Sequence, residues 1–181
     1  MDPRAAATVT SVAARTRSPG IALNPDRLGH AYPPVTYEVS REKLREYARA
    51  TGVVDPALEA DAAEVPLASL TAPPTFAATF TVGLLDRVIG DPELGAHWNL
   101  VHSSQRFRFT RAVRGGDVLR CTPRITEVTS RRALERLTVE VAAHEAGSGE
   151  PVLVAETTLV LREDATSQAP GEASSEAGGQ G

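Results

Sequence analysis

Two side chains that can transfer protons lie close to apolar segments of this sequence: Asp55 and His102. Asp55 belongs to a short run from Gly52 to Leu58, and a second run, Ala72 to Phe76, follows it. A carboxylate and an imidazole can act together as general acid and general base on one face of a substrate. Asp55 also has a structural interpretation, because an Asp before a Pro is a common turn initiator.

His102 is the best candidate acid or base among the four histidines, because imidazole as a group ionises near neutral pH and the other three lie in loops or at an exposed strand end. Strand alternation predicts that His102 lies on the sheet face opposite Phe107 and Phe109. It would share that face with Arg106 and Arg108. A polar residue at an interface or at the rim of a pocket would fit the same pattern, so both interpretations of His102 stay open.

The helix that must position Asp55 is predicted between Ser40 and Gly52. Ser40 can cap the start of this helix, and Gly52 can end it in a left-handed conformation. A strand is predicted just before it, over residues 35–39, because apolar and polar residues alternate there. The run that holds Asp55 therefore begins where the helix ends.

A longer helix is predicted from Pro74 to Val88. Pro74 suits the first turn of a helix, where its missing N–H leaves no hydrogen bond unmade. Four apolar residues then repeat every four positions: Phe76, Phe80, Leu84 and Val88. The other faces are also apolar or small, and a helix with this pattern is expected to be buried all round.

The rest of the sequence predicts four more strands, near residues 101–110, 118–128, 137–141 and 153–161. The turn Val113–Asp117 separates the first two of them. The order of elements is a strand, a helix, a loop, the long helix and then four strands. This order predicts an α+β fold with the helices on one side of an antiparallel sheet.

The composition limits the domain organisation and the partners. At 181 residues the chain fits one domain, predicted over 21–163, between disordered extensions over 1–20 and 164–181. The net charge of −4 gives no reason to expect nucleic acid, and no apolar run is long enough to span a membrane. The single cysteine, Cys121, excludes an internal disulfide and a cysteine-cluster metal site, and no cofactor is expected. A reducing cytoplasm is the expected location.

Six short pieces carry a family resemblance through their order and spacing: Tyr32–Pro34, Tyr37–Val39, Arg41–Ala48, Ala72–Phe76, Val101–Phe107 and Val113–Asp117. The chain resembles the MaoC-like N-terminal family of hot-dog dehydratases. Within that family it is most similar to HadA- and HadC-type accessory subunits of (3R)-hydroxyacyl-acyl carrier protein dehydratase. The resemblance implies a single hot-dog fold, in which an antiparallel sheet wraps around a long central helix.

The resemblance also implies roles for particular positions. In catalytically complete members, an Asp and a His bind the water that adds to a trans-2-enoyl thioester. The matching positions here hold Val53 and Leu58, so the resemblance implies that the catalytic pair is not intact. A backbone N–H at the start of the central helix polarises the thioester carbonyl in such enzymes. This assigns substrate binding to Thr75 and Phe76.

Three functions stay open on these grounds. The first is a non-catalytic subunit that shapes the acyl channel of a heterodimer with a catalytic MaoC-like subunit, in fatty-acid or polyketide metabolism. The second is a self-sufficient hydratase that uses Asp55 or His102, and the third is a stand-alone module that binds an acyl or polyketide ligand. The expected partners are the catalytic subunit or a second copy of this chain, and an acyl thioester of coenzyme A or of acyl carrier protein. The acyl-chain length and the choice of carrier stay open as well.

Four arginines form a basic run beside the predicted turn: Arg106, Arg108, Arg111 and Arg114. Guanidinium groups bind carboxylates and phosphates well, so this run could meet an acidic carrier protein or the phosphates of a thioester arm. A solvated edge of the sheet is the alternative interpretation.

Overall fold

The structure is a computed structural model that describes residues 23–60, 64–95, 100–131 and 134–162. The extensions predicted to be disordered, 1–20 and 164–181, lie outside the described residues. Within the described ranges, no helix combines the length and the apolar character needed to cross a membrane.

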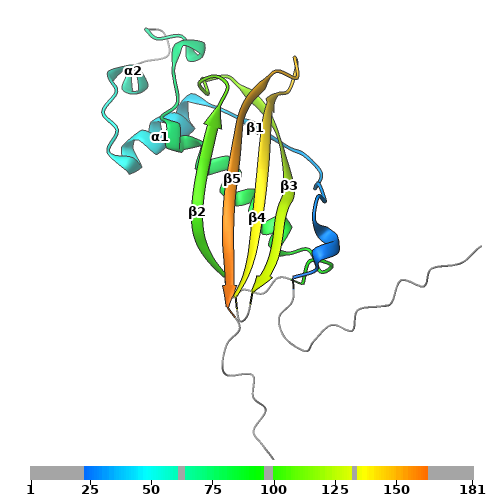
Figure 1. Ribbon diagram of the computed structural model, residues 1–181. Helices are drawn as coiled ribbons and strands as arrows, with labels where there is room; N and C mark the ends of the chain where they lie inside the picture. Colours follow the sequence, from blue (N-terminus) through cyan, green and yellow to red (C-terminus); the bar gives the residue numbers. More distant parts are fainter. Residues whose placement is uncertain (1–22, 61–63, 96–99, 132–133, 163–181) are drawn as a thin grey trace, which may run out of the picture.

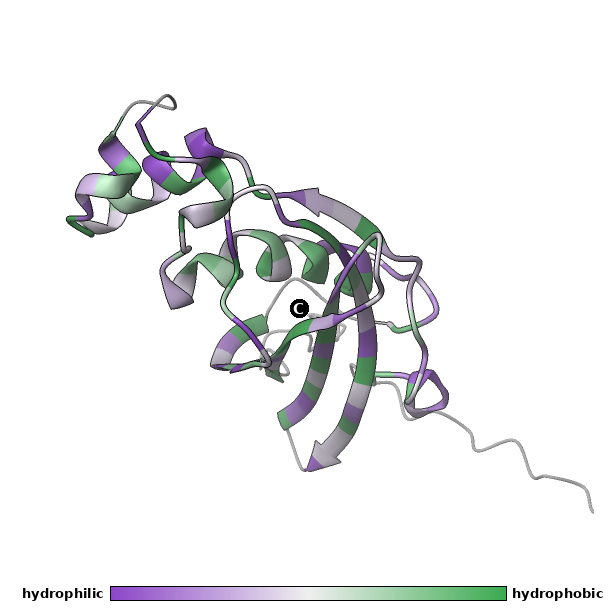
Figure 2. Ribbon diagram, turned by 90° about the horizontal axis from the view of Figure 1, so that it is seen from above, coloured by the Kyte–Doolittle hydropathy of each residue, from purple (hydrophilic) through white to green (hydrophobic). Residues whose placement is uncertain are grey.

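A five-stranded antiparallel sheet forms the body of the protein, with the strand order β1-β3-β4-β5-β2 (Figure 1). The strands are β1 (Val35–Glu38), β2 (Leu100–Phe109), β3 (Val118–Arg131), β4 (Leu134–Glu145) and β5 (Pro151–Arg162). Hydrophobic and hydrophilic residues alternate along the strands, as Figure 2 shows. The predicted α+β class and its five strands are therefore confirmed.

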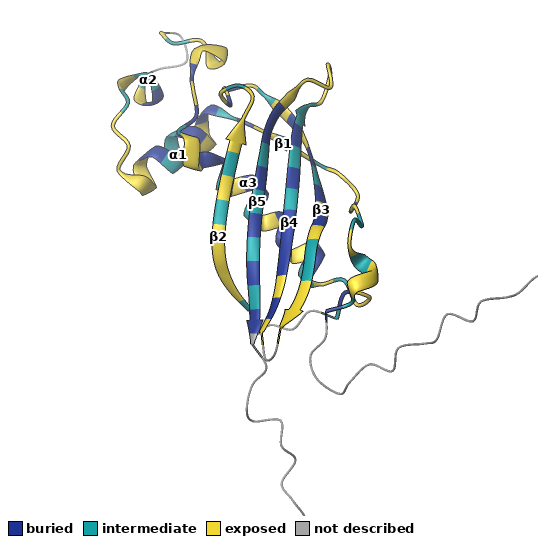
Figure 3. Cartoon of the chain, viewed as in Figure 1, coloured by how far each residue is buried: buried dark blue, intermediate teal, exposed yellow. Residues whose placement is uncertain are grey.

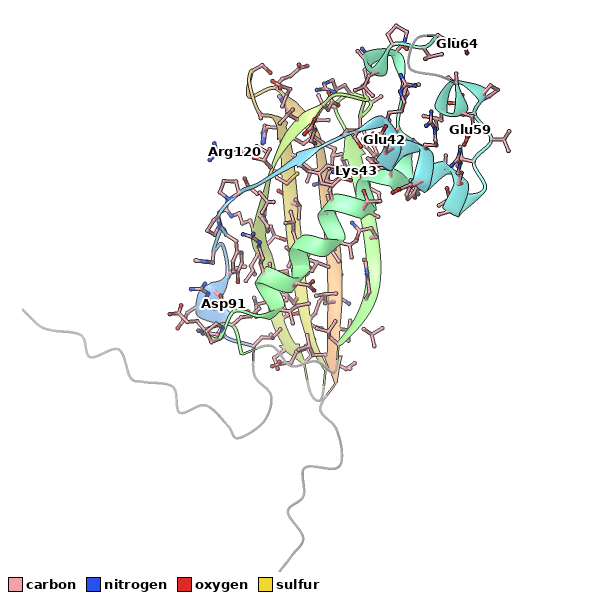
Figure 4. The ribbon with its side chains drawn as sticks, turned by 180° about the vertical axis from the view of Figure 1, so that it is seen from behind. Glu42, Lys43, Glu59, Glu64, Asp91 and Arg120 are labelled. Atoms are coloured by element: carbon pink, nitrogen blue, oxygen red, sulfur yellow. The ribbon has the colours of Figure 1, made fainter. Side chains whose placement is uncertain are left out.

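The central helix crosses one face of this sheet as a run of short helical turns (Figure 4). The turns are η3 (Pro74–Ala77), α3 (Ala78–Thr81), η4 (Val82–Leu84) and α4 (Leu85–Ile89). The four residues that repeat every four positions are all buried, from Val88 at 0% exposure to Leu84 at 8%. The arrangement agrees with the predicted hot-dog architecture, because the sheet packs around this apolar row.

The prediction that the central helix is buried all round is wrong. Six of its residues are exposed in the single chain: Pro74, Thr75, Thr79, Gly83, Asp86 and Arg87. The physical reason is that one sheet covers only one side of a helix. The apolar pattern of the sequence does not distinguish a side packed on the chain's own sheet from a side that a second protein could cover.

Two short helices and a 3₁₀ turn form a segment that projects beyond one end of the sheet (Figure 1). They are α1 (Arg41–Thr51), α2 (Pro56–Glu59) and η2 (Leu67–Ser69). As predicted, the Ser40 hydroxyl caps α1 by accepting a hydrogen bond from the N–H of Lys43 at 3.3 Å. Gly52 ends α1 with a φ of 72°, a conformation that glycine adopts without strain. We refer to residues 41–60 and 64–70 as the overhanging segment.

Candidate functional site

The two runs singled out in the sequence meet where the overhanging segment joins the central helix. Leu58 of α2 is 1% exposed and lies in the same hydrophobic cluster as Phe76. Val53 is 39% exposed and Val54 is 93% exposed, between α1 and α2. The position that matches a catalytic His is thus a core leucine, and the position that matches a catalytic Asp is a half-exposed valine. Neither side chain can transfer a proton.

Asp55 caps α2. Its Oδ1 accepts a hydrogen bond from the N–H of Ala57 at 2.9 Å, and its backbone is extended, as at the N-cap of a helix. This contact supports the structural interpretation of Asp55, because the carboxylate is engaged within its own loop.

Substitution of Asp55 can separate capping from proton transfer. We expect Asp55→Ala to lower the free energy of unfolding by about 1 kcal/mol, and Asp55→Asn to leave it nearly unchanged, because Asn caps helices as well as Asp does. Urea unfolding of both variants measures this. A catalytic carboxylate would behave differently, since Asp55→Asn would then abolish turnover while the protein stayed fully folded.

Three arginines of α1 hold the overhanging segment in place: Arg41, Arg45 and Arg49. Arg41 and Arg45 donate to main-chain carbonyls across the segment: those of Leu58, Ala60 and Val65. Arg49 forms a two-bond ion pair with Glu59, at 3.0 and 2.5 Å, and this pair lies on the outside of α1 and α2, where Figure 4 labels Glu59. The spacing of four residues places all three arginines on one side of α1. That spacing is visible in the sequence, and it was the signal that could have identified these contacts.

The start of the central helix offers one free backbone donor. The N–H of Phe76 donates to the carbonyl of Pro73 at 2.9 Å, so it is already used. Among the described residues, the backbone hydrogen bonds include none from the N–H of Thr75. The Thr75 hydroxyl accepts from the phenol of Tyr47 at 2.8 Å, and the Tyr47 ring meets the Phe76 ring edge-on at 5.4 Å. Thr75 is an exposed residue, and its N–H is the candidate donor at this position.

Tyr47 is a site residue that sequence reasoning missed. Its place beside Leu44 and Ala48 on the apolar face of α1 indicates a core residue, and the ring does pack against the core cluster. The phenol oxygen nevertheless reaches the start of the central helix. Only the tertiary structure brings that hydroxyl to Thr75.

The predicted face of His102 is wrong. The sheet register pairs His102 with Leu159, which is 1% exposed and faces the central helix. A β-bulge between His102 and Ser104 inserts one extra residue, which inverts the alternation. His102 therefore shares its sheet face with Phe107, not with the outward-facing arginines.

The structure does not bring Asp55 and His102 together. Asp55 caps α2 in the overhanging segment, whereas His102 lies near the start of β2, at the other end of the sheet (Figure 1). Gln105 lies on the same face of β2 and accepts a hydrogen bond from the hydroxyl of Thr157 at 2.7 Å. Its Nε2 is buried and has no hydrogen-bond partner among the described residues. A joint acid–base role for Asp55 and His102 finds no support in this geometry.

The comparisons with known proteins agree with this arrangement. A protein-family model described as "FAS1-like, dehydratase domain region" matches residues 26–155. A UPF0336 protein of Thermobifida fusca (strain YX) is 39% identical over 151 residues, which cover 81% of this chain and 99% of that protein.

Two solved structures are similar over three quarters of the chain. One is the C-terminally truncated HadBC (3R-hydroxyacyl-ACP dehydratase) complex from Mycobacterium tuberculosis, with a TM-score of 0.62 and 29% identity, covering 76% of this chain and 99% of that one. The other is described as a MaoC-like dehydratase, with a TM-score of 0.63 and 27% identity, covering 75% of this chain and 42% of that one. The chain thus has the fold of the hot-dog dehydratases.

Proposed function

Because the chain belongs to the family of FAS1-like dehydratase domain regions, we propose that it is a non-catalytic subunit that shapes the acyl channel of a heterodimeric dehydratase. Its partner would be a hot-dog subunit that carries the intact Asp and His. The substrate would be a (3R)-hydroxyacyl or trans-2-enoyl thioester of fatty-acid or polyketide metabolism.

The proposal depends on one combination of features. The arginine contacts that support the overhanging segment are present, and the two positions that match the catalytic pair carry apolar side chains. Arg41 and Arg45 hold the main chain at Ala60 and Leu58 against α1. Leu58 fills the core where a catalytic His would need a polar environment, and Val53 has no titratable group. Such a segment can line an apolar channel, and neither Val53 nor Leu58 can act as a general acid or base.

The open edge of the sheet supports a partner. Strand β2 pairs with β5 on one side only, and its ten residues are half-buried or exposed throughout (Figure 3). Val101 is 61% exposed and Phe109 is 40% exposed on this edge. A long edge strand with exposed apolar residues tends to pair with another chain. The exposed row of the central helix gives a partner a second surface.

The free donor at Thr75 supports a role in binding the thioester. An N–H at the first turn of a helix favours the partial negative charge of a polarised carbonyl oxygen. This chain could therefore hold the thioester carbonyl or the start of the acyl chain while the partner supplies the proton transfer. A stand-alone acyl-binding module would use the same donor, and the two functions differ in whether a partner is required.

Co-expression with a hot-dog subunit that carries the catalytic Asp and His tests the proposal. We expect the two chains to elute from size-exclusion chromatography as one heterodimer, in preference to two homodimers. Val101→Lys combined with Phe109→Lys should split that complex, because the two charges would face an apolar interface. Leu28→Lys is the matched control, because it puts the same charge at an apolar residue that is 56% exposed and lies outside both β2 and the central helix. Two separate homodimer peaks, with the partner indifferent to this chain, would contradict the accessory-subunit proposal.

A further inference from the structure

A pocket lies at the turn between β2 and β3, beside the overhanging segment. Its volume is about 350 Å³, and it is lined by Ala68, Arg111, Arg114, Gly115, Gly116 and Asp117. On the basis of the proposed function, we propose that this pocket binds a phosphate group of the thioester carrier, with Arg114 as its principal ligand. Coenzyme A and the prosthetic arm of a carrier protein share this phosphate chemistry.

The charges in the pocket leave one guanidinium available. Asp117 accepts hydrogen bonds from Arg111 at 2.8 and 3.2 Å, and from the backbone N–H of Arg114 at 2.8 Å. The hydrogen bonds with Asp117 raise the pKa of the Arg111 guanidinium, and Glu150 approaches the same guanidinium at 4.0 Å. These carboxylates therefore compensate Arg111. The side chain of Arg114 is exposed and takes part in none of the ion pairs of the described residues.

The other arginines of the basic run are already paired on the outer face of the sheet. Arg106 lies 3.5 Å from Glu156, and Arg108 lies 3.3 Å from Glu140. An anion would have to compete with these carboxylates at either position. Arg114 alone combines a free guanidinium with a pocket, and a guanidinium forms strong, charge-assisted hydrogen bonds to phosphate oxygens.

The backbone around Arg114 is fixed before any ligand arrives. The N–H of Gly115 donates to the carbonyl of Leu70 at 2.9 Å, and the N–H of Gly116 donates to the carbonyl of Val39 at 2.7 Å. A Cβ at Gly115 would lie 2.4 Å from the carbonyl oxygen of Leu67, so only glycine permits this close packing. The pocket is therefore preformed, which lowers the entropic cost of binding.

The pocket is connected through the chain to the Thr75 N–H, the free donor of the candidate site. Thr71 pairs with Arg114 in an antiparallel bridge, and Thr75 follows four residues later, in the first turn of the central helix. A thioester whose carbonyl binds at Thr75 would extend its pantetheine arm outward past this bridge. The phosphate at the end of that arm would then meet Arg114, and the acyl chain would enter the protein.

Three crotonyl thioesters that differ in their phosphate groups test which phosphate the pocket binds. They are crotonyl-pantetheine without phosphate, crotonyl-4′-phosphopantetheine with one phosphate, and crotonyl-coenzyme A. Calorimetric titration would use the full chain, alone and in its complex with the catalytic subunit. We expect Arg114→Ala to weaken binding of both phosphate-bearing ligands about tenfold, the size of one hydrogen bond to a charged group, and to leave crotonyl-pantetheine unaffected. Arg106→Ala, whose guanidinium is paired with Glu156, should change none of the three.

Each outcome has one meaning. An equal loss for both phosphate-bearing ligands supports a site for the arm's phosphate, and a loss confined to crotonyl-coenzyme A supports a phosphate site for the nucleotide end. An unchanged affinity in Arg114→Ala, or an equal loss for crotonyl-pantetheine, would overturn the phosphate pocket and leave the proposed function intact. Failure of the wild-type chain and its complex to bind any of the three would overturn the proposed function itself.

Discussion

The Phe80→Asp variant is expected not to fold. Phe80 is 4% exposed, and its ring lies 4.8 Å from the ring of Tyr37 and 6.2 Å from that of Phe76. Loss of a buried phenyl ring costs about 3–5 kcal/mol, and a buried carboxylate without a partner adds a further penalty. Domains of this kind have a total stability of about 5–15 kcal/mol. The two penalties together are of that size.

Circular dichroism and solubility on expression measure this outcome. Gly83→Asp is the matched control, because it places the same carboxylate about one turn further along the helix, on the exposed row, where a Cβ has no neighbour within 4 Å. That variant should unfold within about 1 kcal/mol of the wild-type chain. A Phe80→Asp variant that unfolds cooperatively at the wild-type midpoint would show that the helix does not pack on the sheet as described.

The purified chain alone is expected to hydrate crotonyl-coenzyme A no faster than the buffer does. Val53 and Leu58 occupy the two positions that the family resemblance assigns to proton transfer, and a positioned acid–base group accounts for about 10²–10⁴-fold of rate in enzymes that use one. Asp55 and His102 do not replace the pair, because Asp55 caps α2 and His102 lies at the other end of the sheet. Loss of absorbance by the conjugated thioester measures the rate.

Addition of the catalytic hot-dog subunit should restore turnover of longer enoyl thioesters, because the partner then contributes the acid and the base. A matched control uses the partner with its own catalytic His replaced by Ala, which should return the rate to background. Robust turnover by the pure chain, lost in His102→Ala or Asp55→Asn, would instead support a self-sufficient hydratase.

The sequence predicted those features that depend on neighbouring residues. Ser40 and Gly52 bound α1 as expected, because caps act within one helical turn. The four-residue repeat that includes Phe76 and Phe80 identified the buried row of the central helix, because the period of an α-helix is local information.

Features that depend on the tertiary structure could not be predicted. The bulge before Ser104 reversed the face of His102, and no local residue pattern marks it. The exposed row of the central helix depends on how far one sheet reaches around it. The donor at Thr75 became distinguishable from that of Phe76 only through the hydrogen bond from Phe76 to Pro73.

The arginine contacts of α1 have a consequence for how this segment can change over evolutionary time. Arg41 and Arg45 bind carbonyl oxygens, and every type of amino acid presents the same carbonyl. These hydrogen bonds therefore do not depend on the side chains of the residues whose carbonyls are bound. A lineage could exchange a proton-transferring pair for Val53 and Leu58, or restore one, without redesigning the support that positions it. Side-chain changes at these two positions and the persistence of the scaffold are then independent of each other.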